Sequence, residues 1–310
     1  MSTIFVTGAT GELGRGAIPH LLAAGHTVRG VARSDEKAAE LARAGVEPVR
    51  VDLFDATAVS DAVRGTDAVL HLATSIPPMS KAKQRHAWDV NDRLRSEGTR
   101  ILVDAALAAG ASTFVAESIT FPYRAAGDDW IDEDSPFDAR PWLASVADLE
   151  DEIARFSARG GVGVALRFGM FAGPTARSTD ELLGMARRGV APVVGRPDAY
   201  LSSIHTDDAG SAVASALAAP AGTYNVVDDE PLTRRDYADA FARAFGLRRP
   251  RFLPGPMVRL ATGPAGAVLG RSQRVSNRRF RERTGWAPHH RNAWEAWSDI
   301  AQRRTAAASR

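Results

Sequence analysis

Residues 4–14 read IFVTGATGELG, an apolar run that breaks into three glycines with the spacing G-x-x-G-x-x-G. The apolar run predicts a strand, and the amphipathic stretch that follows predicts a helix. In such a turn, Gly8 permits the tight bend, Gly11 leaves room for a pyrophosphate, and Gly14 lets the helix press against the strand. The positive end of the helix then faces the phosphates. The stretch therefore predicts a site that binds a dinucleotide.

Patterns typical of strands and helices alternate through the first half of the chain. Strands are predicted at Ile4–Thr7, Thr27–Ala32, Glu47–Val51, Ala68–His71, Thr113–Ala116 and Gly163–Arg167. Helices are predicted between them, at Gly14–Ala24, Glu36–Ala44, Thr57–Val63, Asn91–Ala109 and Ala144–Ala158. This alternation is typical of a parallel sheet with helices on both faces. We therefore expect the α/β class, a Rossmann-type doubly wound parallel sheet with its ligand at the carboxyl ends of the strands.

The alternation loosens in the second half of the chain, which indicates a second, smaller lobe. We expect residues 1–174 to form the NAD(P)-binding Rossmann domain. Residues 203–228 are expected to return to it through a helix and a strand at Thr223–Val227. Residues 175–202 and 229–310 are expected to form a smaller substrate-binding lobe that is interleaved with the first domain.

Composition excludes several classes of function. The chain has 310 residues, of which 45% are apolar, and it can therefore bury a full core. It has no cysteine, which rules out disulfides, thiol nucleophiles and Cys-ligated zinc. We expect no metal, because His289 and His290 are adjacent and no His, Asp and Glu set has a familiar ligand spacing. Without an apolar run of membrane-spanning length or a signal-peptide pattern, we expect a cytoplasmic protein with no membrane partner.

Charge is uneven along the chain. From Arg248 to Arg310 the sequence holds 14 arginines and three acidic residues, so a basic lobe follows an acidic body. The favoured interpretation is that these arginines are solvated or pair with the acidic body. An anionic substrate stays open. Nucleic acid is disfavoured, because Trp286, Trp294 and Trp297 are spaced like helix-packing residues and are not interleaved with the basic ones.

The residues after the second predicted strand indicate which nucleotide binds. An acid at this place binds the adenosine ribose hydroxyls and selects NAD, whereas a 2′-phosphate requires a cation. Here the strand ends in Ala32 and is followed by Arg33, so the acid is absent. We expect Arg33 to bind the 2′-phosphate, helped by Ser34 and Lys37, while Asp35 is free to cap the next helix. NADP(H) is therefore preferred. NAD(H) stays open, because Arg33 would equally serve as a solvated loop residue.

Further motifs occur in the order and spacing of one family. They are Thr7–Gly14, Val51–Leu53, Leu70–Thr74, Gly98-Thr99, Leu166–Gly169, Ile204–Ala209 and Thr284–Pro288. Together they resemble the short-chain dehydrogenase/reductase superfamily, in its extended and atypical branch of NAD(P)-dependent epimerases, dehydratases and NmrA-like proteins. The resemblance covers most of the chain. With the glycine turn, it implies a cofactor site formed by Thr7, Gly8, Thr10, Gly11, Glu12, Leu13, Gly14, Arg33, Asp52, Leu53, Ala73, Thr74 and Phe168.

The positions that carry the family's chemistry are substituted in this chain. The resemblance implies a tyrosine and, four residues later, a lysine that lowers the tyrosine pKa so that the phenol can exchange a proton with a carbonyl or alcohol. Trp142 stands at the tyrosine position and Val146 at the lysine position. Ile119 replaces the partner serine or threonine, and Arg95 and Met170 replace two asparagines. The resemblance thus predicts a cofactor site without the usual proton-transfer pair.

Other side chains are candidates for supplying the proton. Tyr123, Thr120, Ser118 and His205 are expected near the nicotinamide pocket. Tyr123 would equally be a packing aromatic, and His205 would equally bond to the backbone at a strand end. Glu117 is a further acid, whose place relative to the pocket the sequence leaves open.

These observations favour an atypical NADP(H)-dependent oxidoreductase that transfers hydride directly to a small carbonyl-type substrate. A cyclic or aromatic substrate is expected, because the aromatic residues of this region can line an apolar cavity, although they are also typical of a core. They are Trp88, Phe121, Tyr123, Trp130, Trp142 and Phe168. The second hypothesis is an NmrA-like sensor of NADP(H) with a regulatory protein partner. The third is a sugar-nucleotide epimerase or dehydratase, which would need the missing pair. A homodimer stays open.

Overall fold

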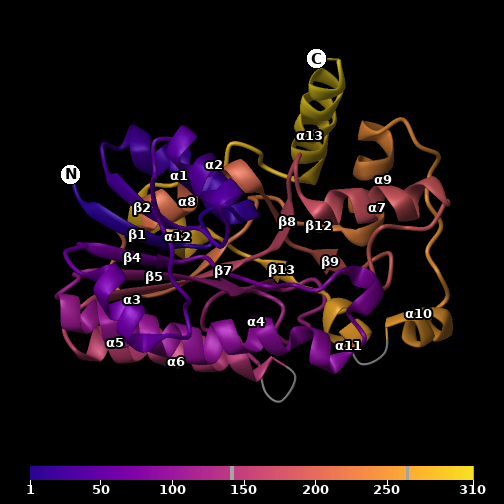
Figure 1. Ribbon diagram of the computed structural model, residues 1–310. Helices are drawn as coiled ribbons and strands as arrows, with labels where there is room; N and C mark the ends of the chain where they lie inside the picture. Colours follow the sequence, from indigo (N-terminus) through magenta and orange to yellow (C-terminus); the bar gives the residue numbers. More distant parts are fainter. Residues whose placement is uncertain (140–142, 263–264, 310) are drawn as a thin grey trace.

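A seven-stranded sheet forms the centre of the protein. The computed structural model describes residues 1–139, 143–262 and 265–309 (Figure 1). The strands of this sheet are β1 (Thr3–Thr7), β2 (Thr27–Val31), β3 (Glu47–Val49), β4 (Ala68–His71), β5 (Thr113–Ile119), β7 (Val162–Phe168) and β11 (Gly222–Val226). Their order is β11-β7-β5-β4-β1-β2-β3, and every neighbouring pair is parallel. The chain winds outward from β1 in both directions, which confirms the predicted Rossmann-type, doubly wound α/β fold.

Helices cover both faces of the sheet (Figure 1). One face carries α1 (Glu12–Ala23), α2 (Asp35–Arg43) and α8 (Thr206–Ala216), and the other carries α3 (Ala56–Val63), α5 (Thr99–Ala109) and α6 (Ala144–Ala158). Successive side chains of β1 join different cores, because the side chains of a strand point to alternate faces. Ile4 and Val6 pack with α1 and α8, while Phe5 packs with α5 and α6.

The helices α1 and α8 approach closely at two glycines. A Cβ atom on Gly16 would lie 2.5 Å from the carbonyl oxygen of Thr206, and one on Gly210 would lie 2.2 Å from the carbonyl oxygen of Gly16. Only glycine permits this distance between two helix backbones. A helix from the second half of the chain is thereby seated on the helix that follows the glycine turn. The division of the chain into two domains stays a prediction.

The helix predicted at Asn91–Ala109 is a continuous helical run with a change of pitch. It begins as α4 (Asp89–Arg93), widens into the π-helical turn η3 (Leu94–Gly98) and continues as α5. Such π-helical turns occur mostly where an extra residue is accommodated, frequently at functional sites. Here the turn contains Arg95, one of the positions at which the sequence departs from the resemblance.

Strand boundaries differ from the prediction in a way that bears on the site. The strand expected at Thr113–Ala116 continues to Ile119, and the one expected to end at Arg167 continues to Phe168, because β5 and β7 pair over their whole length. Glu117 and Ser118 are therefore strand residues. The helix α6 begins at Ala144 as predicted. Trp142 lies outside the described residues.

The remaining elements are three short strand pairs and further helices. Short two-stranded pairs are β6 (Trp130–Ile131) with β13 (Arg274–Val275), β8 (Met170–Ala172) with β10 (Ser203–His205), and β9 (Tyr200–Leu201) with β12 (Leu232–Thr233). The other helices are η1 (Met79–Lys81), η2 (Arg85–Trp88), α7 (Arg177–Arg187), α9 (Arg234–Ala244), α10 (Gly255–Thr262), α11 (Ala265–Leu269), α12 (Arg278–Thr284) and α13 (Ala293–Ala308). A separate core joins α7, α9 and α13 through Leu182, Phe241 and Trp297. In the described part of the chain, no helix combines the length and apolarity needed to cross a membrane.

Candidate active site

The glycine turn between β1 and α1 has no room for side chains. Gly8 has a φ of 72°, and a Cβ there would lie 2.4 Å from the carbonyl oxygen of Leu72. A Cβ on Gly14 would lie 2.3 Å from the carbonyl oxygen of Gly8, whereas one on Gly11 would have a single neighbour, at 3.1 Å. Gly11 is the N-cap of α1 and no side chain caps this helix end. The first amide groups and the positive end of α1 are thus available to a phosphate.

Arg33 follows the carboxyl end of β2 and is the free cation there. It is exposed, and it forms no ion pair with any described residue. Its expected helpers are engaged elsewhere: the Ser34 hydroxyl accepts from the Lys37 amide as the cap of α2, and the Lys37 ammonium pairs with Glu40 at 2.8 Å. Asp35 pairs with Arg50 at 3.1 Å and does not cap α2.

The other residues expected to bind the cofactor follow the carboxyl ends of neighbouring strands. Asp52 comes after β3, is exposed, and accepts a hydrogen bond from the Phe54 amide at 3.0 Å. Ala73 and Thr74 come after β4 and are half-buried. Phe168 ends β7 and is fully buried in the core shared with α1 and α8. Leu53 packs against the core on the opposite face. Thr10 and Glu12 are partly exposed at the turn, and Leu13 is buried behind it.

Thr7 and His71 tie the ends of β1 and β4 together. The Thr7 hydroxyl lies 2.7 Å from His71 Nδ1, and His71 Nε2 lies 3.2 Å from the Leu94 carbonyl oxygen. A carbonyl only accepts, so Nε2 carries the proton and Nδ1 accepts from the hydroxyl. Burial lowers the pKa of His71 to about 4, which keeps the ring neutral. The pair joins the carboxyl ends of β1 and β4 and connects them to η3.

Ser118 and Tyr123, two of the candidate proton donors, belong to one hydrogen-bonded chain. The Ser118 hydroxyl donates to Glu150 of α6 at 2.6 Å, and Arg167 grips both oxygens of Glu150 at 2.8 and 2.6 Å. Arg167 also donates to the Tyr123 hydroxyl at 2.7 Å, and that hydroxyl donates to Asn225 at 2.8 Å. Burial raises the pKa of Tyr123 to about 12, against the influence of Arg167. The protons of both hydroxyls are therefore engaged within the protein.

Thr120 lies between these two residues and differs from them. It is 2% exposed, its amide donates to the Phe168 carbonyl at 3.0 Å, and its carbonyl accepts from Gln273 at 3.3 Å. The backbone is thereby fixed from both sides. Within the described ranges, no residue hydrogen-bonds its hydroxyl.

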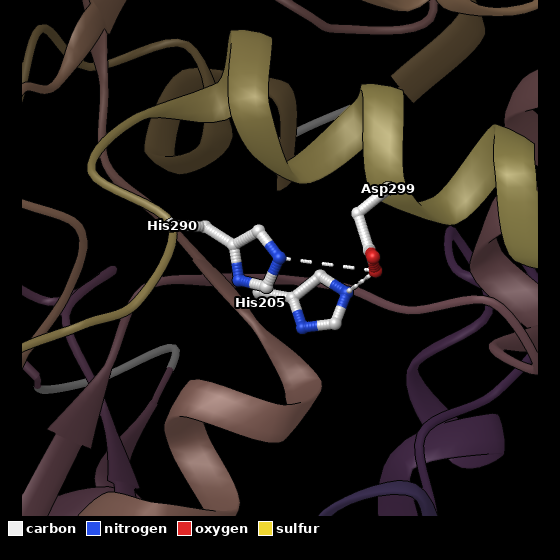
Figure 2. Close-up of side chains that lie close together, drawn as sticks. All are labelled: His205, His290 and Asp299. Carbon is white, nitrogen blue, oxygen red and sulfur yellow. Dashed lines mark ion pairs between the residues drawn. The ribbon is translucent and has the colours of Figure 1, made fainter.

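His205 lies in a buried cluster with His290 and Asp299 of α13 (Figure 2). Its Nδ1 accepts from the Asp207 amide at 3.1 Å, and its Nε2 lies 3.3 Å from Asp299 Oδ2. The His290 ring lies 4.1 Å away between centroids, and its Nδ1 lies 2.8 Å from Asp208 Oδ2. Burial and the neighbouring His290 charge lower the pKa of His205. Burial opposes the charge on His290, but the hydrogen bond to Asp208 and the charges of Asp208 and Asp299 raise its pKa.

The ligand atoms of this cluster lie within 4.8 Å of one another, close enough to consider a metal ion. The hydrogen bonds favour an ion-paired cluster instead. Because His205 Nδ1 accepts from an amide, its proton resides on Nε2, the atom that faces Asp299. Asp299 Oδ2 also lies 2.7 Å from Arg303 Nε. We interpret the cluster as the connection between α13 and the start of α8. Sequence spacing gave no signal for it, because its members are up to 94 positions apart in the chain.

The segment where the resemblance places the tyrosine and lysine is apolar in the structure. Val146 is fully buried on α6, and the Ser145 hydroxyl beside it donates to Asp92 at 2.7 Å. Two charged residues lie buried nearby, Arg95 of η3 and Glu117 of β5, each 3% exposed. Burial raises the pKa of Glu117 to about 7, and the charge of Arg95 opposes this rise. The usual lysine is thus absent, but a buried cation and a buried acid are present.

The fold and the glycine turn define a Rossmann-type protein with a nucleotide-binding turn. Comparison with known proteins narrows this class. A family model described as NAD(P)H-binding matches residues 8–157. The chain is 34% identical to the 3-diazoavenalumate denitrifying reductase of a Streptomyces species, over 96% of this chain and 98% of that protein. It is 29% identical to the 2-alkyl-3-oxoalkanoate reductase of Stenotrophomonas maltophilia, over 79% and 76% of the two chains.

A solved structure shares the fold. Human epimerase family protein SDR39U1 with NADPH matches with a TM-score of 0.77 at 22% identity, over 97% of this chain and 99% of that one. The chain belongs to the short-chain dehydrogenase/reductase superfamily, as an atypical, epimerase-like member that binds NAD(P).

Proposed function

We propose that this protein is an NADP(H)-dependent reductase that transfers hydride directly to a small cyclic or aromatic substrate. One observation carries the proposal: the glycine turn is intact, while Val146 occupies the lysine position with its side chain fully buried. When bound, the nicotinamide supplies the hydride. Transfer requires that the acceptor atom be held in near-attack geometry, which binding alone can provide. The two reductases among the relatives support this class of activity.

Arg33 is proposed to select NADP(H) over NAD(H). It is the exposed, unpaired cation after β2, whereas Lys37 pairs with Glu40. A guanidinium suits a phosphate because it offers two parallel donors. Arg33→Ala should weaken NADPH binding by about tenfold or more and leave NADH binding nearly unchanged. Calorimetry with both nucleotides measures this, with the exposed Arg43→Ala as the matched control. Equal losses for the two nucleotides would reject the assignment.

Thr120 is proposed to hydrogen-bond the substrate oxygen in a carbonyl reduction, with the proton then taken from water. Tyr123 and Ser118 donate their hydroxyl protons within the protein, and His205 Nε2 faces Asp299 at 3.3 Å. The Thr120 hydroxyl, in contrast, forms no hydrogen bond with any described residue. Tyr123 and Ser118 then act as positioning residues. Thr120→Val should lower kcat by about tenfold or more, while Thr120→Ser keeps most of it. A Tyr123→Phe loss of kcat larger than that of Thr120→Val would reverse the assignment.

A second candidate reaction follows from the name of the 34% identical relative, which describes a diazo compound losing nitrogen. Hydride added to the terminal nitrogen of an aromatic diazonium group gives an aryl diazene. The diazene then loses N₂: its N–H and C–N bonds break, and the ring carbon takes up a proton with the electron pair of the C–N bond, so that the net products are the arene and N₂. Atoms and electrons balance without a proton donor, so a diazonium substrate has no use for a tyrosine and lysine. The loss of that pair in this chain is what such chemistry permits.

The test is NADPH oxidation with a matched panel: a carboxylated aryl diazonium, a 2-alkyl-3-oxoalkanoate and a simple aromatic ketone. The proposal expects steady oxidation with at least one member, accompanied by N₂ release for the diazonium. The Gly11→Ala variant is the control that removes only the cofactor contribution, because its Cβ meets one neighbour at 3.1 Å. Tight NADPH binding without oxidation of any member would reject the reductase. That result would favour the NmrA-like sensor, and interconversion of a sugar nucleotide would favour the epimerase.

A further inference from the structure

Arg95 is a buried cation with unused hydrogen-bond donors. Its side chain lies in the π-helical turn η3 and is 3% exposed. Its Nε and Nη2 atoms have no hydrogen-bond partner among the described residues. These two atoms lie on the same side of the guanidinium and form the fork that binds both oxygens of a carboxylate. A charged group that is buried with unpaired donors is costly, which indicates a partner that the described residues do not supply.

The position of Arg95 places this fork beside the carboxyl end of β4, the edge of the sheet at which folds of this type bind their ligands. The Leu94 carbonyl, one residue earlier, accepts from His71 at the carboxyl end of β4. Asn91, one helical turn earlier, accepts from the Ser75 amide in the segment after β4, at 3.0 Å. On its other side η3 packs against α6, where Ser145 bonds to Asp92. Arg95 therefore lies between the end of β4 and the first turn of α6, the turn that carries Val146.

Two of the three acids that face Arg95 are engaged elsewhere, and none of the three forms a hydrogen bond with its Nε or Nη2 atom. Asp92, Glu117 and Glu150 are the charges that act on it, while its own burial lowers its pKa. Glu150 accepts a hydrogen bond from Ser118 and pairs with Arg167. Asp92 accepts a hydrogen bond from Ser145 and pairs with Arg85 at 2.7 Å. Glu117 is itself buried, and burial raises its pKa. The fork is thus left for a ligand.

We propose that Arg95 is the anion-binding residue of the substrate site, and that its Nε and Nη2 fork takes a carboxylate of the substrate. The inference rests on the proposed function, because the reductase substrate is what carries the anion. The names of the two reductase relatives, a diazoavenalumate and an oxoalkanoate, are those of carboxylates. In a site shielded from water, charge-assisted hydrogen bonds reach their full strength. In this proposal, Arg95 of η3 takes the place of the lysine that the resemblance implies on α6.

The test compares cinnamate with its neutral isostere cinnamamide on the NADPH-loaded protein, by calorimetry. The wild type should bind cinnamate about tenfold or more tightly than cinnamamide. Arg95→Met should abolish that preference, while Arg95→Lys, which keeps the charge without the fork, should retain part of it. NADPH affinity should be unchanged in both variants and reports that each is folded. If Arg95→Met does not bind NADPH and is therefore not folded, the comparison of the wild type with Arg95→Lys still tests the proposal.

Equal binding of the two probes by the wild type, binding of neither, or a preference that survives in Arg95→Met would overturn the assignment. Because probe binding needs no turnover, this result is independent of the reductase activity. A sensor without turnover would still show the preference if Arg95 binds carboxylates. A reductase without this subsite would turn over a carboxylate and its methyl ester with equal KM.

Discussion

The glycine turn and the start of α6 have different sequence constraints. At the glycine turn, the nearest neighbours of a Cβ on Gly8 or Gly14 are backbone atoms 2.3–2.4 Å away, so the fold itself excludes any side chain. At the start of α6, Val146 is fully buried, and another residue type can be accommodated there if its neighbours change with it. The backbone decides which residues can stand at the glycine turn, whereas the neighbouring side chains decide this at the start of α6. A protein of this fold can therefore keep its nucleotide-binding glycine turn while the residues that transfer protons are replaced.

The largest effect is expected for Gly14→Ala, which tests the backbone constraint. The new Cβ would lie 2.3 Å from the Gly8 carbonyl oxygen and 2.7 Å from that of Ala9, so the turn has to open. We expect a loss of about 3 kcal/mol or more in the free energy of unfolding, measured by urea denaturation. Gly11→Ala is the control, with its single contact at 3.1 Å. It should lose about 1 kcal/mol or less and bind NADPH poorly. A Gly14→Ala protein as stable as Gly11→Ala would contradict the comparison.

Periodicity predicted the sheet because its signals are local. The strands at Ala68–His71 and Thr223–Val227 lie where the alternation of apolar residues placed them, within a residue. The π-helical turn at Leu94–Gly98 was not predicted, because no residue type marks a widened helix. The extension of β5 to Ile119 was missed because Glu117 and Ser118 are polar, and a polar pair normally ends a buried strand.

The candidate site also has parts that the sequence predicted and parts that it did not. The glycine turn and Arg33 follow from a contiguous motif, so the sequence alone located them. The partners of Tyr123 come from Arg167 on β7 and Asn225 on β11, and those of His205 come from α13. Such contacts depend on which strands are neighbours and on where the last helix docks. A single sequence carries no signal for either, so the engaged state of these candidates appears only in the structure.

An intermediate effect is expected for Val146→Lys, which restores the family's cation. Val146 is fully buried on α6, the helix that packs against η3, so we expect the ammonium to be buried close to Arg95. Two buried like charges should cost about 3 kcal/mol of folding stability, measured by urea denaturation. Val146→Met is the volume-matched apolar control. The double variant Val146→Lys/Arg95→Asn carries the lysine and the asparagine that the resemblance implies at these positions. In it we expect most of this loss of stability to be recovered. If the double variant is no more stable than Val146→Lys, the two cations do not share a site.

The smallest effect is expected for His290→Gln, in the cluster that connects α13 to the start of α8. Burial opposes the charge on His290, but Asp208 at 2.8 Å and Asp299 raise its pKa above the usual 6.5. His205 and Arg303 also face the ring and oppose its charge. A raised histidine pKa stabilises the fold fully below the unfolded value, and this stabilisation is lost as pH rises through the folded value. Asp208, whose pKa is lowered, contributes above its usual 3.8 and loses its contribution on acidification.

The difference in stability between wild type and His290→Gln should therefore be greatest between about pH 5 and about pH 6.5, at about 1 kcal/mol, and should shrink as the pH rises to about 9. Urea denaturation across this range measures it. His289→Gln is the matched control, because His289 is the exposed neighbour and only its backbone amide bonds to Asp208. The same pH-dependent loss in His289→Gln, or a loss in His290→Gln that stays constant across the range, would show that the charge on His290 does not hold α13 in place.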